Sequence, residues 1–177
     1  GIFFNKTLLK WLNISEPKTW QDLTDPKFYD LLSFADIRHS SSSLVLLTII
    51  LLGHSWEEAW KILMKVAGNT KQFTLSSAEP IKKVVTGDTV AAGSIDFYAY
   101  AKIAKLGAKS LGFVLPSQLT LLSSDPVAIL KGAPHRKASE RFVEFILSVK
   151  AQKLLILPRG EKDGPRFHTL ARMAINP

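Results

Sequence analysis

The stretch ADIRHSSSSLVLLTIILLG, residues 35–53, contains the pattern that decides the fold most directly. Residues 31–35, where it begins, are apolar and strand-like, and residues 44–52 are apolar except for Thr48. The length of this second run and the glycine at position 53 favour a buried helix over a strand. Four consecutive serines, Ser40–Ser43, stand in front of it, and Ser41, Ser42 or Ser43 is expected to cap the helix.

The four serines have two open interpretations. In the first, the serines form a helix cap or a loop. A serine N-cap is worth about 1 kcal/mol and uses one hydroxyl, so four hydroxyls exceed what a cap needs. A helix N-terminus also presents free N–H groups and a partial positive charge, which makes it an anion site. Ser76 and Ser77 repeat the arrangement before another expected helix.

The rest of the chain alternates between helical and strand-like segments, which predicts the α/β class. In the helix expected after Ser55, Ser55 and Glu58 have capping-box spacing. Its apolar face is predicted to carry Trp56, Trp60, Leu63 and Ala67, and Gly68 is predicted to end it. Further helices are predicted at residues 6–14, 77–87 (capped by Ser77 and ended by Gly87), 97–107, 135–148 and 150–157, and strands at 1–5, 89–95, 111–116 and 126–130.

Composition narrows the classes of partner. The chain has 23 Lys and Arg against 15 Asp and Glu, a net charge of +8, which favours nucleic acid, an anionic membrane or small anions. No run of five or six basic residues occurs, so most lysines are expected on a solvated face. The longest apolar run is far below the roughly 20 residues that span a bilayer, so no membrane insertion is expected. We find no signal segment, and we interpret the start at Gly1 as a processed or cloned boundary.

No pattern indicates an enzyme or a cofactor. The chain has no cysteine, which excludes disulfides, thiolate catalysis and cysteine metal sites. It lacks the G-x-S-x-G, G-x-G-x-x-G, Walker and H-E-x-x-H motifs, and its four histidines are isolated in sequence. We therefore expect neither catalysis, nor a cofactor, nor a resident metal.

Several segments, in this order, resemble one known family. They are GIFFN (1–5), PKTWQDLTDPKF (17–28), the serines, GHSWEEAWKIL (53–63), FTLSS (73–77), IDFYA (95–99), DPVAILKGAP (125–134) and FVEFILS (142–148). The chain resembles the extracellular solute-binding proteins of ABC importers, in the ferric-iron-type branch that also contains binders of phosphorylated small molecules. The resemblance implies the type II periplasmic binding fold, in which two α/β lobes joined by a hinge hold a ligand between them.

The resemblance also implies a division of the chain. Residues 1–110 match the second lobe, residues 111–160 the returning part of the first lobe, and residues 161–177 a C-terminal loop and hinge segment. The N-terminal part of the first lobe has no counterpart. Half a lobe leaves sheet edges open, so strands near 111–115 and 127–130 are expected to have an unpaired edge or to pair with another copy of the chain.

The resemblance assigns the site residues. Ser41, Ser42, Ser43, Ser76 and Ser77 open helices toward the ligand. Asp96 either accepts hydrogen bonds from ligand hydroxyls or caps its own helix, and Tyr98 lies at the cleft wall. Iron-binding relatives have two adjacent tyrosines at this point, but residue 97 is phenylalanine.

The expected function is therefore capture of a small anionic solute, phosphorylated or carboxylated, and its delivery to the permease subunits, on the periplasmic or extracellular side. The first alternative is a ferric-iron binder that uses Tyr98 with a synergistic anion. An alternative of another class is a basic nucleic-acid-binding or regulatory domain on the same fold, although the chain shows no basic stripe and we expect no nucleic acid as partner.

Overall fold

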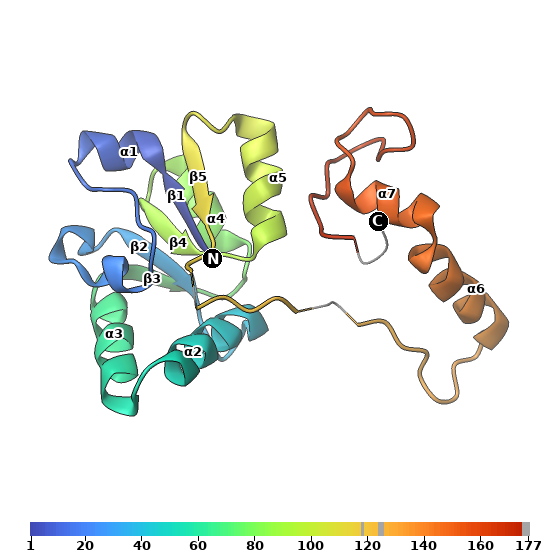
Figure 1. Ribbon diagram of the computed structural model, residues 1–177, viewed down its shortest axis with the longest axis horizontal. Coiled ribbons are helices and arrows are strands. Elements are labelled where there is room, and N and C mark those ends of the chain that lie inside the picture. The colour runs from blue at the N-terminus through green and yellow to red at the C-terminus, as the bar shows by residue number, and fades with distance from the viewer. Residues whose placement is uncertain (118, 124–125, 175–177) are drawn as a thin grey trace. The chain divides into compact units, whose positions relative to one another are not determined.

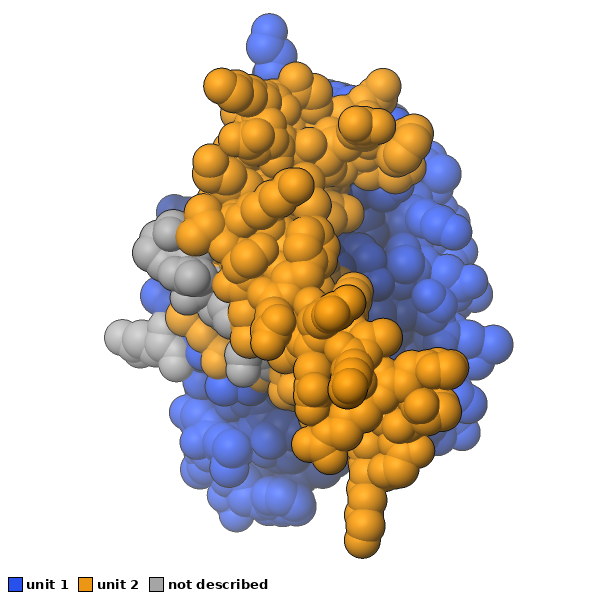
Figure 2. Space-filling view, turned by 90° about the vertical axis from the view of Figure 1, so that its right-hand side faces the viewer, with its two compact units in different colours: residues 1–121 blue, residues 122–177 orange. Residues whose placement is uncertain are grey.

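The chain forms two compact units in a computed structural model that describes residues 1–117, 119–123 and 126–174. Unit 1 is Gly1–Leu121 and unit 2 is Leu122–Pro177. Figure 1 labels their helices and strands, and Figure 2 colours the two units separately. The α/β class predicted from the sequence is confirmed.

Unit 1 is built on a five-stranded mixed sheet in the order β3-β2-β4-β1-β5. The central strand β4 (Ala91–Gly93) is parallel to β2 (Leu32–Ala35), which in turn is parallel to β3 (Thr70–Thr74). Strand β1 (Ile2–Asn5) runs antiparallel to both β4 and β5 (Leu111–Val114). Unit 1 therefore continues beyond residue 110, because β5 is an edge strand of this sheet.

Helices cover both faces of the sheet. One face packs on α1 (Lys6–Trp11), the short 3-10 turns η1 (Gln21–Thr24) and η2 (Pro26–Phe28), α2 (Ser41–Gly53) and α3 (Trp56–Gly68). The other face packs on α4 (Glu79–Thr86) and α5 (Asp96–Leu106), around Phe3, Ile81 and Val84. The alternation of side chains along β1 sends Phe3 to one core and Ile2 and Phe4 to the other.

Helix α3 packs through a different face from the one predicted. Its buried residues are Ala59, Ile62 and Val66, whereas Trp56 is 64% exposed and Trp60 37% exposed. Both sets have helical spacing, so spacing alone did not distinguish the buried face from the exposed one. Gly68 also does not end the helix in a left-handed conformation; it is still helical, and Asn69 is the right-handed C-cap.

Helix α2 forms where it was predicted but is less buried than its composition suggests. Only Ile50 is fully buried, and Leu44 and Leu52 are exposed. Strand β3 was missed, because its sequence TKQFT is mostly polar and it lies at the sheet edge. The strand predicted at 126–130 is wrong: these residues are described without a strand and are mostly exposed.

Unit 2 contains α6 (Arg136–Leu147) and α7 (Val149–Ile156), both as predicted, followed by an irregular segment. The hydroxyl of Ser148 caps α7 by accepting from the N–H of Ala151. Only Ala151 and Gln152 are buried in the part of the unit that the structure describes, and α6 has no buried residue. This unit therefore has a much thinner core than unit 1.

Candidate ligand-binding edge of the sheet

The parallel strands bring the predicted site residues to one edge of unit 1. Because β2, β3 and β4 run in the same direction, their carboxyl ends lie at the same edge. Each is followed by a short loop and a helix: β2 by α2, β3 by α4 and β4 by α5. In open α/β sheets, ligands bind outside the carboxyl ends of the strands, where helices begin.

Ser40, not one of the three serines after it, caps α2. Its backbone is extended, with φ −131° and ψ 108°, and its side-chain oxygen accepts from the N–H of Ser43 at 3.3 Å. The cap predicted at Ser41, Ser42 or Ser43 is therefore wrong by at least one position. A turn, closed by the N–H of His39 on the carbonyl of Asp36, leads the chain into Ser40, and the helix begins directly after it.

Three serine hydroxyls from two loops meet at this edge. The Oγ of Ser40 lies 2.9 Å from the Oγ of Ser42 and 2.9 Å from the Oγ of Ser77. The Oγ of Ser42 lies 3.2 Å from that of Ser77. We call Ser40, Ser42 and Ser77 the serine cluster. It joins the start of α2 to the segment that leads into α4, although Ser40 and Ser77 are 37 residues apart in sequence.

The other predicted serines lie nearby but outside the cluster. Ser41 is exposed and Ser43 half-buried at the start of α2. Ser76 is exposed, and its hydroxyl accepts from the N–H of Ala78 at 3.3 Å. Ser77 does not cap α4 as predicted, since the cap position is Ala78 and no side chain caps there. Its hydroxyl is instead engaged with the other two serines.

Asp96 and Tyr98 are on α5, which begins at this same edge. The Oδ1 of Asp96 accepts from the N–H of Phe97 at 2.8 Å, so the carboxylate contacts the first turn of its own helix. Tyr98 is 36% exposed, and its ring centroid lies 4.4 Å from that of Phe97. The described contacts do not connect either residue to the serine cluster.

Arg38, two residues before the first serine, already forms an ion pair with Asp36. The guanidinium of Arg38 donates through Nε to both carboxylate oxygens of Asp36, at 3.0 and 3.1 Å. This pairing lowers the pKa of Asp36 to about 2, mainly through the side-chain hydrogen bond. Asp36 was not identified from the sequence, although a carboxylate directly after a buried strand was the available signal. The edge therefore offers mainly neutral donors: hydroxyls and backbone N–H groups.

Two other classes of site find no support in the described residues. No group of three or more His, Asp or Glu side chains lies close enough to hold a metal ion within them. Across the same residues, every helix is too short or too polar to cross a membrane.

Known proteins with similar sequences and folds include several binding proteins. The periplasmic binding protein AfuA from Actinobacillus pleuropneumoniae, solved with fructose-6-phosphate bound, superposes with a TM-score of 0.76 at 29% identity, over 86% of this chain and 48% of AfuA. The phosphoglycerate transport regulatory protein PgtC of Salmonella typhimurium is 26% identical over 155 residues, 88% of this chain and 38% of PgtC. An uncharacterized protein of Haemophilus influenzae is 30% identical over 156 residues, 87% of this chain and 44% of its own length.

The chain therefore spans less than half the length of each of these relatives. The sheet order and the structural match confirm the type II periplasmic binding fold that the sequence resemblance implied. The family model for bacterial extracellular solute-binding proteins matches residues 1–158, almost the whole chain. The chain belongs to the bacterial extracellular solute-binding protein family.

Proposed function

We propose that the full-length protein is the substrate-binding component of an ABC importer, and that it captures a small phosphorylated or carboxylated organic anion outside the cytoplasmic membrane. In this proposal it hands the solute to the permease subunits when its two lobes reopen. The observation that carries the proposal is the serine cluster, which places hydroxyls from two loops at the start of α2.

The chemistry of this edge suits an anion bound by neutral donors. The first N–H groups of a helix have no intrahelical acceptor. Those of Ser41 and Ser42 have no protein acceptor among the described residues, while the N–H of Ser43 is taken by Ser40. Hydroxyl groups can rotate to donate to an incoming oxygen. Two free N–H groups and the hydroxyls of the cluster would together hold the oxygens of a phosphate or carboxylate.

The relatives favour a phosphorylated ligand. AfuA was solved with fructose-6-phosphate, and PgtC is named for phosphoglycerate transport. Asp96 begins the neighbouring helix α5, and its carboxylate accepts hydrogen bonds only. We assign it to the hydroxyl groups of the organic part of the ligand, and Tyr98 to the wall of the cleft.

The two units would have different roles in the complete protein. Unit 1, including β5, would be the second lobe and carry the serine half of the site. Residues beyond it, to about position 160, would be the returning part of the first lobe, and residues 161–177 the C-terminal loop and hinge segment. The facing half of the cleft would be formed by residues of the full-length protein that correspond to the part of the relatives this chain does not cover.

Ferric-iron binding is not favoured as a second function. Phe97 stands where iron-binding relatives have one of two tyrosines, and a phenyl ring cannot donate an electron pair to a metal.

Calorimetric titration of the full-length protein tests the proposal. Fructose-6-phosphate, phosphoglycerate and citrate are compared with fructose and glycerol, and at least one anion is expected to bind while the neutral compounds do not. Ser42→Ala and Ser77→Ala each remove a hydrogen bond to a charged oxygen, worth about 1.5–3 kcal/mol, so the Kd should rise roughly 10- to 150-fold. Ser110→Ala is the matched control, because Ser110 is exposed, directly precedes β5 at the opposite edge of the sheet and is not a predicted ligand-binding residue.

Tighter binding of fructose than of its phosphate, or no binding of any of the three anions, would contradict the proposed ligand class. Unchanged affinity in both Ser42→Ala and Ser77→Ala would show that the anion is bound elsewhere.

A further inference from the structure

The end of unit 1 opposite the serine cluster gathers lysines from three elements. Helices α4 and α5 each start at the carboxyl edge of the parallel strands and return to the other edge, where the next strand begins. Strand β1 runs antiparallel to β4, so helix α1, which follows β1, also lies at that other edge. Figure 1 shows α1 and the last turn of α5 at this end and α2 at the opposite one.

Direct contacts hold the three elements together at this end. The ammonium group of Lys6, at the start of α1, donates to the carbonyl of Ala108 after α5, at 3.1 Å. The side-chain amide of Asn5 donates to the carbonyl of Val84 on α4, at 3.3 Å. We call the lysines carried by these segments the lysine face: Lys6, Lys10, Lys82, Lys105 and Lys109.

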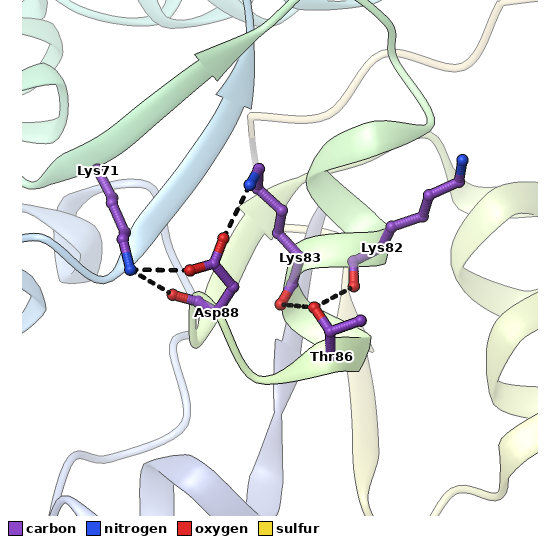
Figure 3. Close-up of polar contacts among 5 residues, drawn as sticks. All are labelled: Lys71, Lys82, Lys83, Thr86 and Asp88. Carbon is purple, nitrogen blue, oxygen red and sulfur yellow. Dashed lines mark hydrogen bonds and ion pairs between the residues drawn. The ribbon is translucent and has the colours of Figure 1, made fainter.

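Asp88, an acid that follows α4, is engaged by lysines outside the lysine face. The carboxylate of Asp88 receives the ammonium groups of Lys71 and Lys83, each at 2.8 Å, as Figure 3 shows. Lys82 extends away from this carboxylate in the same view. No member of the lysine face forms an ion pair within the described residues.

Helix electrostatics explains only part of this cluster. Cations stabilise the last turn of a helix, which accounts for Lys10 and Lys105. Lys6 is the first residue of α1, where a cation is unfavourable, and Lys109 lies beyond α5. Trp11, directly after Lys10, is 79% exposed, which is unusual for the largest side chain. An exposed tryptophan beside unpaired lysines indicates a surface that meets a partner.

We propose that the lysine face docks on an anionic phospholipid surface and keeps the protein close to the membrane. Lysines are flexible point charges and need no fixed acceptor geometry, which suits mobile lipid headgroups. Each lysine near an anionic bilayer contributes to attraction, and tryptophan is enriched at the membrane–water interface. The lysine face contains no arginine, the side chain best suited to nucleic-acid phosphates and bases, so a nucleic acid fits it less well. This proposal is independent of which solute is bound.

Vesicle flotation with the full-length protein tests this docking. The protein should float with vesicles of phosphatidylcholine and phosphatidylglycerol, not with phosphatidylcholine alone, and raised salt should release it. The side chains of Lys82, Lys105 and Lys109 are exposed and form no ion pair within the described residues, so the triple change to Gln should leave folding intact. Each lost lysine lowers partitioning about fivefold, so the triple variant should lose on the order of 100-fold.

The matched control changes Lys131, Lys137 and Lys162 to Gln. These lysines are exposed in unit 2 and form no ion pair within the described residues, and the change in net charge is identical. The control should lose far less affinity, and Trp11→Ser should weaken retention without a change of charge. Equal losses in the two triple variants, or no flotation with anionic vesicles at low salt, overturn the proposal. Retention on a DNA fragment but not on vesicles overturns it as well.

Discussion

Replacing Ser40 by alanine separates the two roles of this residue. Ser40 and Ser55 are both N-caps of helices of 13 residues, and each hydroxyl accepts from a backbone N–H at 3.3 Å. Only Ser40, 3% exposed, also contacts two further hydroxyls, at 2.9 Å each. Ser55→Ala therefore removes a cap alone, and Ser40→Ala removes a cap together with the centre of the serine cluster.

The magnitudes follow from these contacts. Loss of a serine cap costs about 1 kcal/mol, which is the whole effect expected for Ser55→Ala. Each buried hydroxyl contact adds about 1 kcal/mol, partly offset because Ser42 and Ser77 still contact each other at 3.2 Å. Ser40→Ala should therefore lower the free energy of unfolding by about 2–3 kcal/mol in total.

Urea unfolding followed by tryptophan fluorescence measures this difference. All four tryptophans, at positions 11, 20, 56 and 60, lie in unit 1, so the signal reports the unfolding of that unit only. The midpoint for Ser40→Ala should fall well below that for Ser55→Ala, with an unchanged slope. If both variants lose the same stability, the cluster contributes nothing beyond a cap, and its interpretation as a rigid, preorganised site is wrong.

Three further predictions address the packing, the charge and the metal chemistry of the chain. Ile62→Ala should cost about 2–5 kcal/mol and Met64→Ala less than about 0.5 kcal/mol in the same urea assay, because Ile62 is 1% exposed and Met64 65% exposed; similar costs would contradict the buried face of α3. Lys71 and Lys83 lower the pKa of Asp88 from 3.8 to about 2, so this carboxylate stabilises the fold above pH 4 and loses that effect as the pH falls toward 2. Asp88→Asn should therefore lose less stability than the parent between these pH values in acid titration by circular dichroism, and parallel curves would show that the ion pairs are not maintained in solution. The full-length protein titrated with ferric citrate should stay colourless, because Phe97 cannot ligate iron; a visible band abolished by Tyr98→Phe would restore the iron alternative.

Local signals in the sequence predicted the parts of the fold that depend on neighbouring residues. The cap at Ser55 and the helix end at Gly87, whose φ is 81°, follow from short-range rules and are confirmed. The α/β class and the type II fold were likewise available from the alternation of elements and from motif order. The cap and the helix end are each determined within a few residues of chain, and the fold class by the order of segments along it.

Features that depend on tertiary contacts between distant segments could not be predicted in this way. Helical spacing fits both the Trp56–Trp60 stripe and the Ala59–Ile62–Val66 face. Only the packing of α3 against the core of unit 1 shows that the second face is buried. The contact between Ser40 and Ser77 requires β2 and β3 to be neighbours, and β3 had no recognisable pattern. The sequence therefore indicated serines at the start of α2 and before α4, but the cap was assigned to the wrong serine and the contacts among Ser40, Ser42 and Ser77 were not predicted.

The two ends of unit 1 are expected to respond differently to salt, which gives a way to separate their functions. At the serine cluster the donors are hydroxyls and backbone N–H groups, and Arg38 is already paired with Asp36. Such neutral donors act over hydrogen-bond distances, and counterions screen them little. The lysine face acts through exposed charges, whose reach is the Debye length of about 10 Å at 0.1 M salt and about 3 Å at 1 M. Solute affinity measured by calorimetry should therefore change little over this range, whereas vesicle retention should be lost. A solute affinity that falls as steeply as vesicle retention would mean that a free cation, not the serine cluster, holds the anion.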